Sequence, residues 1–320
     1  MLSYDWLKIV GLALACIFFW MLIFTMTATR IMPYQQFTIF SHQANGLLSE
    51  AYYDRINALG QQIFSFETIE THTYDLGAQT DMAGMMLQTR LSTNEGDVIF
   101  VPKSADKESP YQDGENTTYP LTYLDTMLLR YSNTFFDIEK YLDGLDAYLN
   151  SFYYGDHSVN AMDEDAVKTA FINRVTANRD KRFKTEKQKQ AGALLEVERI
   201  EKYKTAYDEF YWYLDNGVVT LETVKTLNSD GSDMVDEVTG EVYMEGKYAL
   251  NLCPNVDTMG KLSEWYQYNI GTEDNPIWTA KDMCVMFFDM YGVADSYEYE
   301  SLLYVTHLIK TCSTVQPTNP

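Results

Sequence analysis

The sequence predicts a mixed α/β region, rich in helices, that follows an N-terminal transmembrane helix. An uncharged apolar run occupies residues 9–26, and residues 64–102 indicate a strand, a helix and a second strand in succession. Residues 120–214 mainly carry the three- and four-residue spacing of apolar side chains that is typical of helices. With 320 residues, 46% of them hydrophobic, the chain is long enough to bury a sizeable core.

The apolar run "IVGLALACIFFWMLIFTM" predicts a membrane-spanning helix over residues 7–29, because a bilayer-crossing helix needs about 20 consecutive apolar residues. One alternative is a cleaved signal peptide, but cleavage after Ala28 would place Met26 where a small residue is required. The other alternative is lipoprotein processing at Cys16, which lacks a matching motif before it and has a long apolar stretch after it. The favoured interpretation is an uncleaved signal anchor.

The flanking charges decide little about orientation, because Lys8 lies on one side of the apolar run and Arg30 on the other. A short tail before an apolar first helix is the usual arrangement for exporting the rest of a chain. The predicted layout is a cytoplasmic tail at residues 1–6, an anchor in the lipid bilayer at residues 7–29, and an extracytoplasmic domain at residues 30–320. Since no second apolar run reaches spanning length, we expect a single-pass protein of the cell membrane.

Residues 31–320 of the exported part are strongly acidic, with 22 Lys and Arg residues against 45 Asp and Glu residues. Such a surface repels nucleic acid and anionic lipid, so no nucleic-acid partner is expected. Residues 163–204 differ, because they hold 11 basic and 8 acidic residues. One interpretation is a docking face for an acidic partner. The favoured one is a solvated helical hairpin with pairs such as Glu198 and Lys202.

The first half of the exported domain is expected to begin with a helix over residues 34–63, where Phe37, Phe40 and later apolar residues recur at three- and four-residue steps. A strand is expected at residues 64–74, a helix at residues 82–93, and a buried strand from Val98 to Val101. Parallel strands covered on both faces become continuous apolar runs, so residues 64–102 predict a βαβ unit.

The remaining elements follow from caps, periodicity and turn residues. The expected helices are two within residues 121–153, then one each at residues 164–178, 185–214, 257–268, 280–290 and 296–312. A hairpin is expected around Thr239-Gly240-Glu241, and a second buried strand at residues 248–252. The region from residue 218 to residue 312 is thus expected to hold a hairpin and the closing helices.

No catalytic or metal-binding constellation is present. The chain lacks the common nucleophile, zinc-protease and phosphate-loop motifs, and its four histidines are isolated in sequence, so we expect neither an enzyme nor a metal or cofactor. Three cysteines lie outside the anchor, which is too few for a disulfide framework; at most one pair is expected, with Cys284 and Cys312 as the choice. Sparse cysteines favour a Gram-positive bacterium, which has a single membrane.

Three segments together resemble the extracellular solute-binding proteins of bacterial ABC importers. The first is "MAGMMLQTRLSTNEGDVIFVPK", in which a helix precedes an apolar strand; the second is "GKYALNL"; the third is "MYGVADSYEYESLLYVTHLIK", which is similar to a closing helix. The resemblance covers about half of the exported chain and implies a periplasmic-binding-protein-like fold. The chain departs from the family in its permanent anchor and in the helix expected at residues 31–63, where the family has a first strand.

The resemblance implies a ligand, sugars being one class, held by loops at the carboxyl ends of strands. The residues expected to contact it are Lys103 and Asn255, which follow buried strands, and the potential stacking platforms Trp212, Trp265 and Trp278. Each Trp is also a good candidate for a core or interface residue. The partner would be an ABC permease. The alternative function is an envelope accessory, scaffold or sensor protein that retains the fold and binds another envelope protein.

Overall fold

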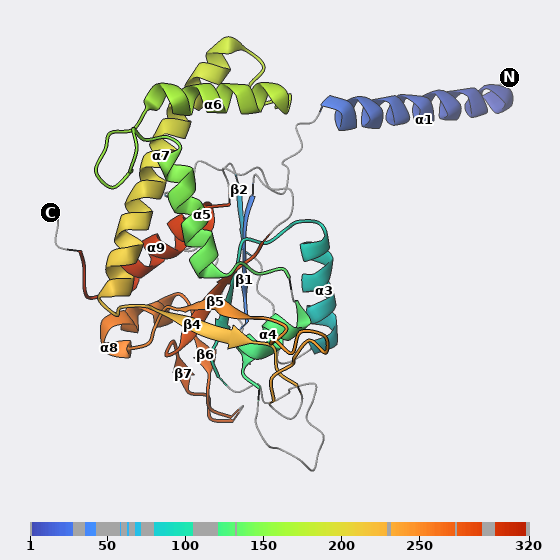
Figure 1. Cartoon of the computed structure of the whole chain (residues 1–320). Helices are drawn as coiled ribbons and strands as arrows, with labels where there is room; N and C mark the ends of the chain where they lie inside the picture. Colours follow the sequence, from blue (N-terminus) through green and yellow to red (C-terminus); the bar gives the residue numbers. More distant parts are fainter. Residues whose placement is uncertain are drawn as a thin grey trace. The chain divides into compact units, whose positions relative to one another are not determined.

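The computed structural model describes residues 2–27, 36–42, 58, 63, 68–71, 80–104, 121–131, 133–228, 232–272, 274–289 and 298–317 (Figure 1). The chain divides into two compact units, Met1–Met32 and Pro33–Pro320. The first unit holds helix α1 (Leu2–Thr27). Within α1, the stretch Lys8–Thr25 has a mean hydropathy of 2.2 and none of it is buried, so by length and composition it is able to cross a membrane.

The second unit is built on a mixed six-stranded sheet with the strand order β2-β1-β3-β8-β5-β4. Strand β1 is parallel to both β2 and β3, whereas β8, β5 and β4 follow in antiparallel succession. The strands are β1 (Gln36–Ser41), β2 (Thr68–Thr71), β3 (Val98–Pro102), β4 (Thr220–Lys225), β5 (Glu245–Asn251) and β8 (Met283–Phe287). Strands β6 (Tyr268–Asn269) and β7 (Trp278–Thr279) form a separate small ribbon. The predicted mixed α/β class is confirmed.

Helices cover both faces of this sheet. Side chains alternate along β3, so that Val98 and Phe100 share one core cluster with α5, α7 and α9, and Ile99 and Val101 share the other with α3 and α4. The helices are α3 (Thr80–Ser92), α4 (Tyr123–Arg130), α5 (Ile138–Asn150), α6 (Glu164–Ala177), α7 (Glu186–Asp215), α8 (Val256–Met259) and α9 (Glu300–Cys312). The predicted buried strand after Gly96 is therefore correct, with all five of its residues buried.

The expected helix at residues 34–63 is wrong over Gln36–Ser41, which form β1. Phe37 and Phe40 are three apart and thus fit a helical spacing, but both faces of β1 are covered, so Phe37, Ile39 and Phe40 are all buried. Because each face of β1 packs against a core cluster, apolar residues occupy both faces, and their spacing no longer distinguishes strand from helix. Of the rest of this expected helix, residues 43–57, 59–62 and 34–35 lie outside the described residues.

The predicted strand–helix–strand unit has the expected elements but a different arrangement. Strand β2, helix α3 and strand β3 follow one another, and both strands are parallel to β1. They are not neighbours, because β1 lies between them: Ile39 of β1 is opposite Thr71 on one side and Val98 on the other. Strand β1, at residues where a helix was expected, therefore lies at the centre of the parallel part of the sheet.

The expected helix at residues 280–290 is also wrong, because Met283–Phe287 form β8. This strand lies antiparallel between β3 and β5, and all of its residues are buried. The run "MCVMFF" lacks the β-branched residues that usually identify a strand, apart from Val285. Its burial on both faces, imposed by tertiary structure, overrides that weak local preference.

The helix starts were predicted more accurately. Asp163 caps α6 by accepting a hydrogen bond from the backbone N–H of Ala166, and Thr185 forms a capping box with Gln188 at the start of α7. The helix expected at residues 257–268 is shorter, with α8 followed by a 3-10 helix at Gly260–Glu264. The expected hairpin around Thr239-Gly240-Glu241 has a single bridge between Val235 and Val242.

The expected disulfide is wrong. Cys253, Cys284 and Cys312 are all free thiols and buried. Cys284 belongs to the core cluster under α3 and α4, whereas Cys312 belongs to the cluster on the other face of the sheet. Burial raises the pKa of Cys312 to about 12, so its thiol stays protonated and unreactive at neutral pH.

Candidate ligand site

The carboxyl ends of β1, β3 and β5 meet at one edge of the sheet, because these three strands run in the same direction. Four polar side chains are hydrogen-bonded there. Lys103 Nζ donates to Glu222 Oε2 at 2.6 Å, and Asn251 Nδ2 lies 3.1 Å from both Glu222 Oε1 and Asp282 Oδ1. We call Lys103, Glu222, Asn251 and Asp282 the strand-end cluster.

The strand-end cluster is an ion pair supported by an amide. The hydrogen bond to Glu222 raises the pKa of Lys103. Burial opposes ionisation of Glu222, but the hydrogen bonds from Lys103 and Asn251 outweigh it and lower the pKa of that carboxyl. Both groups are therefore charged at neutral pH, and each already has its partner. Such a cluster stabilises the edge of the sheet and leaves only part of its hydrogen-bonding capacity for a ligand.

The end of β1 carries two buried polar side chains that have no hydrogen-bond partner among the described residues. They are the hydroxyl of Ser41 and both ring nitrogens of His42. The His42 ring lies 4.3 Å from the ring of Tyr123, and burial, assisted by the charge of Arg130, lowers the pKa of His42 to about 3. His42 is therefore a neutral ring at physiological pH, packed in the core against the tilted ring of Tyr123.

The five residues predicted to contact a ligand lie on five elements or their ends. Lys103 is in the strand-end cluster. Asn255 follows β5, and its side chain caps α8 by accepting from the N–H of Asp257. Trp212 on α7 and Trp265 after the 3-10 helix are half-buried against the core, and Trp278 in β7 is 41% exposed. The sheet thus brings Lys103 and Asn255 to the same edge, whereas the three Trp residues lie on three separate elements.

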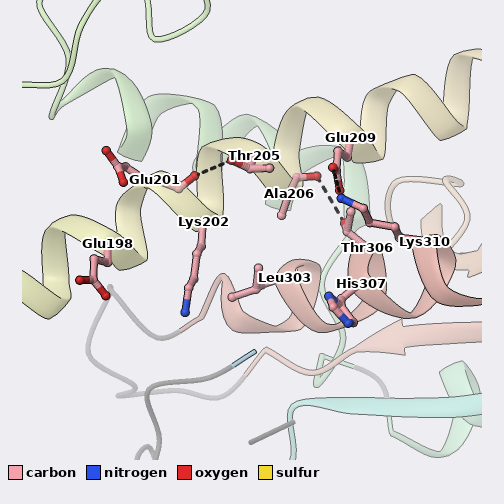
Figure 2. Close-up of a pocket in the computed structure, with 10 residues that line it drawn as sticks. All are labelled: Glu198, Glu201, Lys202, Thr205, Ala206, Glu209, Leu303, Thr306, His307 and Lys310. Atoms are coloured by element: carbon pink, nitrogen blue, oxygen red, sulfur yellow. Dashed lines mark hydrogen bonds and ion pairs between the residues drawn. The ribbon is translucent and has the colours of Figure 1, made fainter. Parts of the chain in front are cut away.

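A hollow that the sequence did not indicate lies between α7 and α9 (Figure 2). We call it the α7–α9 groove; its volume is about 420 Å³, within the range of small-molecule sites. One wall comes from α7 and the other from α9, and polar side chains predominate in both. The lining residues are Glu198, Glu201, Lys202, Thr205, Ala206, Glu209, Leu303, Thr306, His307 and Lys310.

The charges in the groove are unevenly paired. Lys310 Nζ lies 2.5 Å from Glu209 Oε1, across the two helices. Lys202 Nζ donates to the backbone oxygen of Ile63 at 3.2 Å, in place of the pair with Glu198 that its spacing suggested. Glu198 and Glu201 are exposed and make no side-chain hydrogen bond or ion pair with the described residues. Burial lowers the pKa of His307, so its ring is neutral and the groove is acidic overall.

The sequence does carry a signal for one wall of the groove. Residues 198, 202, 205 and 209 recur at three- and four-residue steps, so they share a face of a helix. The sequence favours a solvated helical hairpin over residues 163–204, which include Glu198 and Lys202, since nothing in it says that α9 packs alongside α7. The pairing of two helices far apart in sequence is a tertiary fact, and the groove follows from it.

A second cluster of ionisable side chains lies in the core, on the far side of α7 and α9. Arg199 Nη2 lies 2.5 Å from Glu196 Oε1, and Arg199 Nη1 lies 3.9 Å from Glu300 Oε1. Arg174 also pairs with Glu196, at 3.0 Å. Glu300 is only 1% exposed, and burial raises its pKa to about 7 despite the nearby Arg199.

Among the described residues, no group of three or more His, Cys, Asp and Glu side chains is placed to hold a metal ion. The arrangement at the groove and at the strand ends suits reversible binding through hydrogen bonds and charge. Comparison with known proteins found no matching family, no matching curated protein and no matching solved structure.

Proposed function

We propose that this chain is a membrane-anchored, extracytoplasmic solute-binding-like protein that captures a small polar ligand and serves an ABC importer. The observation that carries the proposal is the α7–α9 groove, which has the volume of a small-molecule site and two carboxylates without partners among the described residues. The apolar helix α1 supports the anchor, and the parallel β2-β1-β3 strands between two helical layers support a binding-type α/β domain.

The lining of the groove favours a ligand that carries an amino group. Glu198 and Glu201 supply negative charge, while Lys310 is neutralised by Glu209. None of the described residues that line the groove is aromatic apart from the neutral ring of His307, so the stacking that sugar sites use is weak here. Amino acids, short peptides and polyamines therefore fit this groove better than sugars.

The test is thermal unfolding of the full chain in detergent with amino acids, dipeptides, polyamines and sugars. A ligand at a hundred times its Kd stabilises by about 2.7 kcal/mol, which raises the Tm of a domain of this size by roughly 5 °C. We expect Glu201→Gln to remove the shift and Lys103→Ala to preserve it. The reverse result would move the ligand to the strand-end cluster. A well-folded protein that responds to no compound would contradict ligand capture.

The alternative function, an envelope scaffold, is favoured by one specific feature. Met82, Met85 and Met86 on α3 are between 47% and 68% exposed, whereas Leu87 and Leu91 on the opposite side of the helix are buried. Exposed methionines are typical of adaptable protein-binding surfaces. Pull-down of the full chain from solubilised membranes separates the two functions: recovery of an importer permease supports solute capture, and recovery of other envelope proteins supports a scaffold.

A further inference from the structure

The connection between α6 and α7 is the most basic part of this acidic molecule. Residues 174–189 contain seven Lys and Arg residues and only two acidic ones, within a chain whose net charge is −22. We call residues 174–189 the hairpin tip. In Figure 1, α6 and the start of α7 extend beyond the sheet of the second unit.

Four cations of the hairpin tip are exposed and lack a partner among the described residues. Three others are paired: Arg174 with Glu196, Arg182 with Asp180 and Lys189 with Glu186. The remaining cationic side chains make no ion pair and no side-chain hydrogen bond there. They are Arg179, Lys181, Lys184 and Lys187.

The hairpin tip presents these cations from a well-held backbone. Arg182 binds Asp180 through both Nε and Nη2, at distances of 2.7 to 3.2 Å, and its own N–H also donates to that carboxylate. The Phe183 ring packs against Phe171 at 5.0 Å between centroids, and Gly192 leaves room for both rings. Little conformational freedom is therefore lost when an anionic partner binds.

The hairpin tip lies toward the end of the sheet at which the chain arrives from the anchor. Arg174 contacts Glu196, which contacts Arg199, which lies beside Glu300 at the start of α9. The next residue, Ser301, donates to the backbone oxygen of Asp97 at 3.4 Å. Asp97 in turn accepts from the N–H of Thr38, close to the start of β1. These contacts connect the tip to the amino end of β1.

Only residues 28–35 separate the end of α1 from the start of β1, and a linker of that length spans at most roughly 28 Å. The amino end of β1 therefore stays within the span of that linker from the end of α1. We propose that the hairpin tip docks on anionic phospholipid headgroups of the bilayer that holds α1. The inference rests on the anchoring part of the proposed function.

Screening by salt limits the repulsion between the overall negative charge and anionic lipid. At physiological ionic strength electrostatic interactions are screened over about 8 Å, so the headgroups respond to the local charge of the tip and not to the whole molecule. Each basic residue near an anionic surface contributes a factor of about five in affinity. Four cations without partners among the described residues are thus enough to favour a membrane-bound orientation of a domain that is already tethered.

The experiment places the full chain in nanodiscs of phosphatidylcholine, with or without phosphatidylglycerol, and measures amide hydrogen exchange at residues 174–189. Residues 232–245, far along the chain, serve as the internal reference. We expect exchange at the tip to slow by roughly tenfold in the discs that contain phosphatidylglycerol, and high salt to abolish that difference. Lys181→Glu, Lys184→Glu and Lys187→Glu combined should remove it too.

The matched control combines Lys140→Glu, Lys261→Glu and Lys281→Glu, which change the net charge equally at exposed sites outside the tip. It should preserve the slower exchange. Equal exchange in both kinds of disc, or loss of the effect in the control, overturns the docking. If exchange at the tip slows in phosphatidylcholine discs, and only at high protein density, the tip binds a second copy of the chain. That result also overturns docking on anionic lipid. A chain that fails to enter discs overturns the anchor itself, which distinguishes the two failures.

Discussion

The two ends of strand β3 hold charged side chains in opposite settings. At the entry end, Asp97 accepts a hydrogen bond from the N–H of Thr38 at 2.6 Å, and burial of its carboxyl raises its pKa to about 7. At the exit end, the side chain of Lys103 is 43% exposed and is paired with Glu222. The entry end is buried and disfavours an ionised side chain, whereas the exit end is partly exposed and holds an ion pair. A single strand therefore joins a buried end that disfavours charge to a partly exposed end that holds an ion pair.

The largest effect is expected from Gly96→Ala at the entry end. Gly96 has φ +143°, and a Cβ there would lie 2.8 Å from Phe40 Cε2 and 3.2 Å from Leu91 Cδ2. Strain and overpacking together should lower the free energy of unfolding by about 2–5 kcal/mol. The control is Gly260→Ala, since Gly260 has φ −57° and open space around it. Urea unfolding measures the stability of both variants. Equal unfolding midpoints would refute the close packing around Gly96.

The next effect concerns the buried ring of His42, at the end of the neighbouring strand β1. The pKa of His42 is about 3 in the fold and about 6.5 in an unfolded chain, so the neutral ring is favoured by folding. Its contribution to stability is full above pH 6.5 and is lost as pH falls toward 3. As the pH falls from 7 to 4, we expect the free energy of unfolding of His42→Phe to rise, relative to that of the wild type, by on the order of 3 kcal/mol. Parallel curves of unfolding free energy against pH would show that His42 does not titrate.

Glu300, near the entry end, should give the opposite slope. Its folded pKa of about 7 exceeds the unfolded value, so the protonated carboxyl is favoured by folding. That contribution is full below about pH 4.5 and is lost as pH rises through 7. Arg199, Glu196, Lys202 and Tyr203 act on this carboxyl. As the pH rises from 5 to 8, the free energy of unfolding of Glu300→Gln should therefore rise, relative to that of the wild type, by on the order of 2–3 kcal/mol. Chemical unfolding across that range measures both proteins.

The smallest effect is expected at the open exit end. The Lys103–Glu222 pair is partly solvated, and such pairs contribute about 0.5–1 kcal/mol. Lys103→Ala should therefore change stability by no more than that, compared with Lys140→Ala on an exposed face of α5. A loss of several kcal/mol would mean that the exit end is as structural as the entry end, and the contrast along β3 would disappear.

Local signals predicted the local features of this fold. Asp163 and Thr185 mark helix starts because capping depends on neighbours within three residues. The apolar run from Val98 to Val101 identifies a buried strand for the same reason. β1 and β8 were mistaken for helices, because strands covered on both faces lose the alternation that distinguishes them, and which faces are covered depends on distant segments.

The candidate site was less predictable than the fold. Lys103 could be placed at a strand end, because the strand before it was recognisable. The α7–α9 groove could not, since it exists only where residues about a hundred positions apart come together, as in the 2.5 Å contact between Glu209 and Lys310. Charge segregation over residues 163–204 was visible in the sequence. Which of those cations lack partners became clear only from the salt bridges.

The central position of β1 has a mechanical consequence. The strand that follows the anchor most closely in sequence is hydrogen-bonded to β2 on one side and to β3 on the other, and runs parallel to both. A pull on the anchor along that strand would load both ladders in shear, so that several hydrogen bonds must break together. Force applied to β1 from the side of α1 would thus act on the middle of the parallel strands.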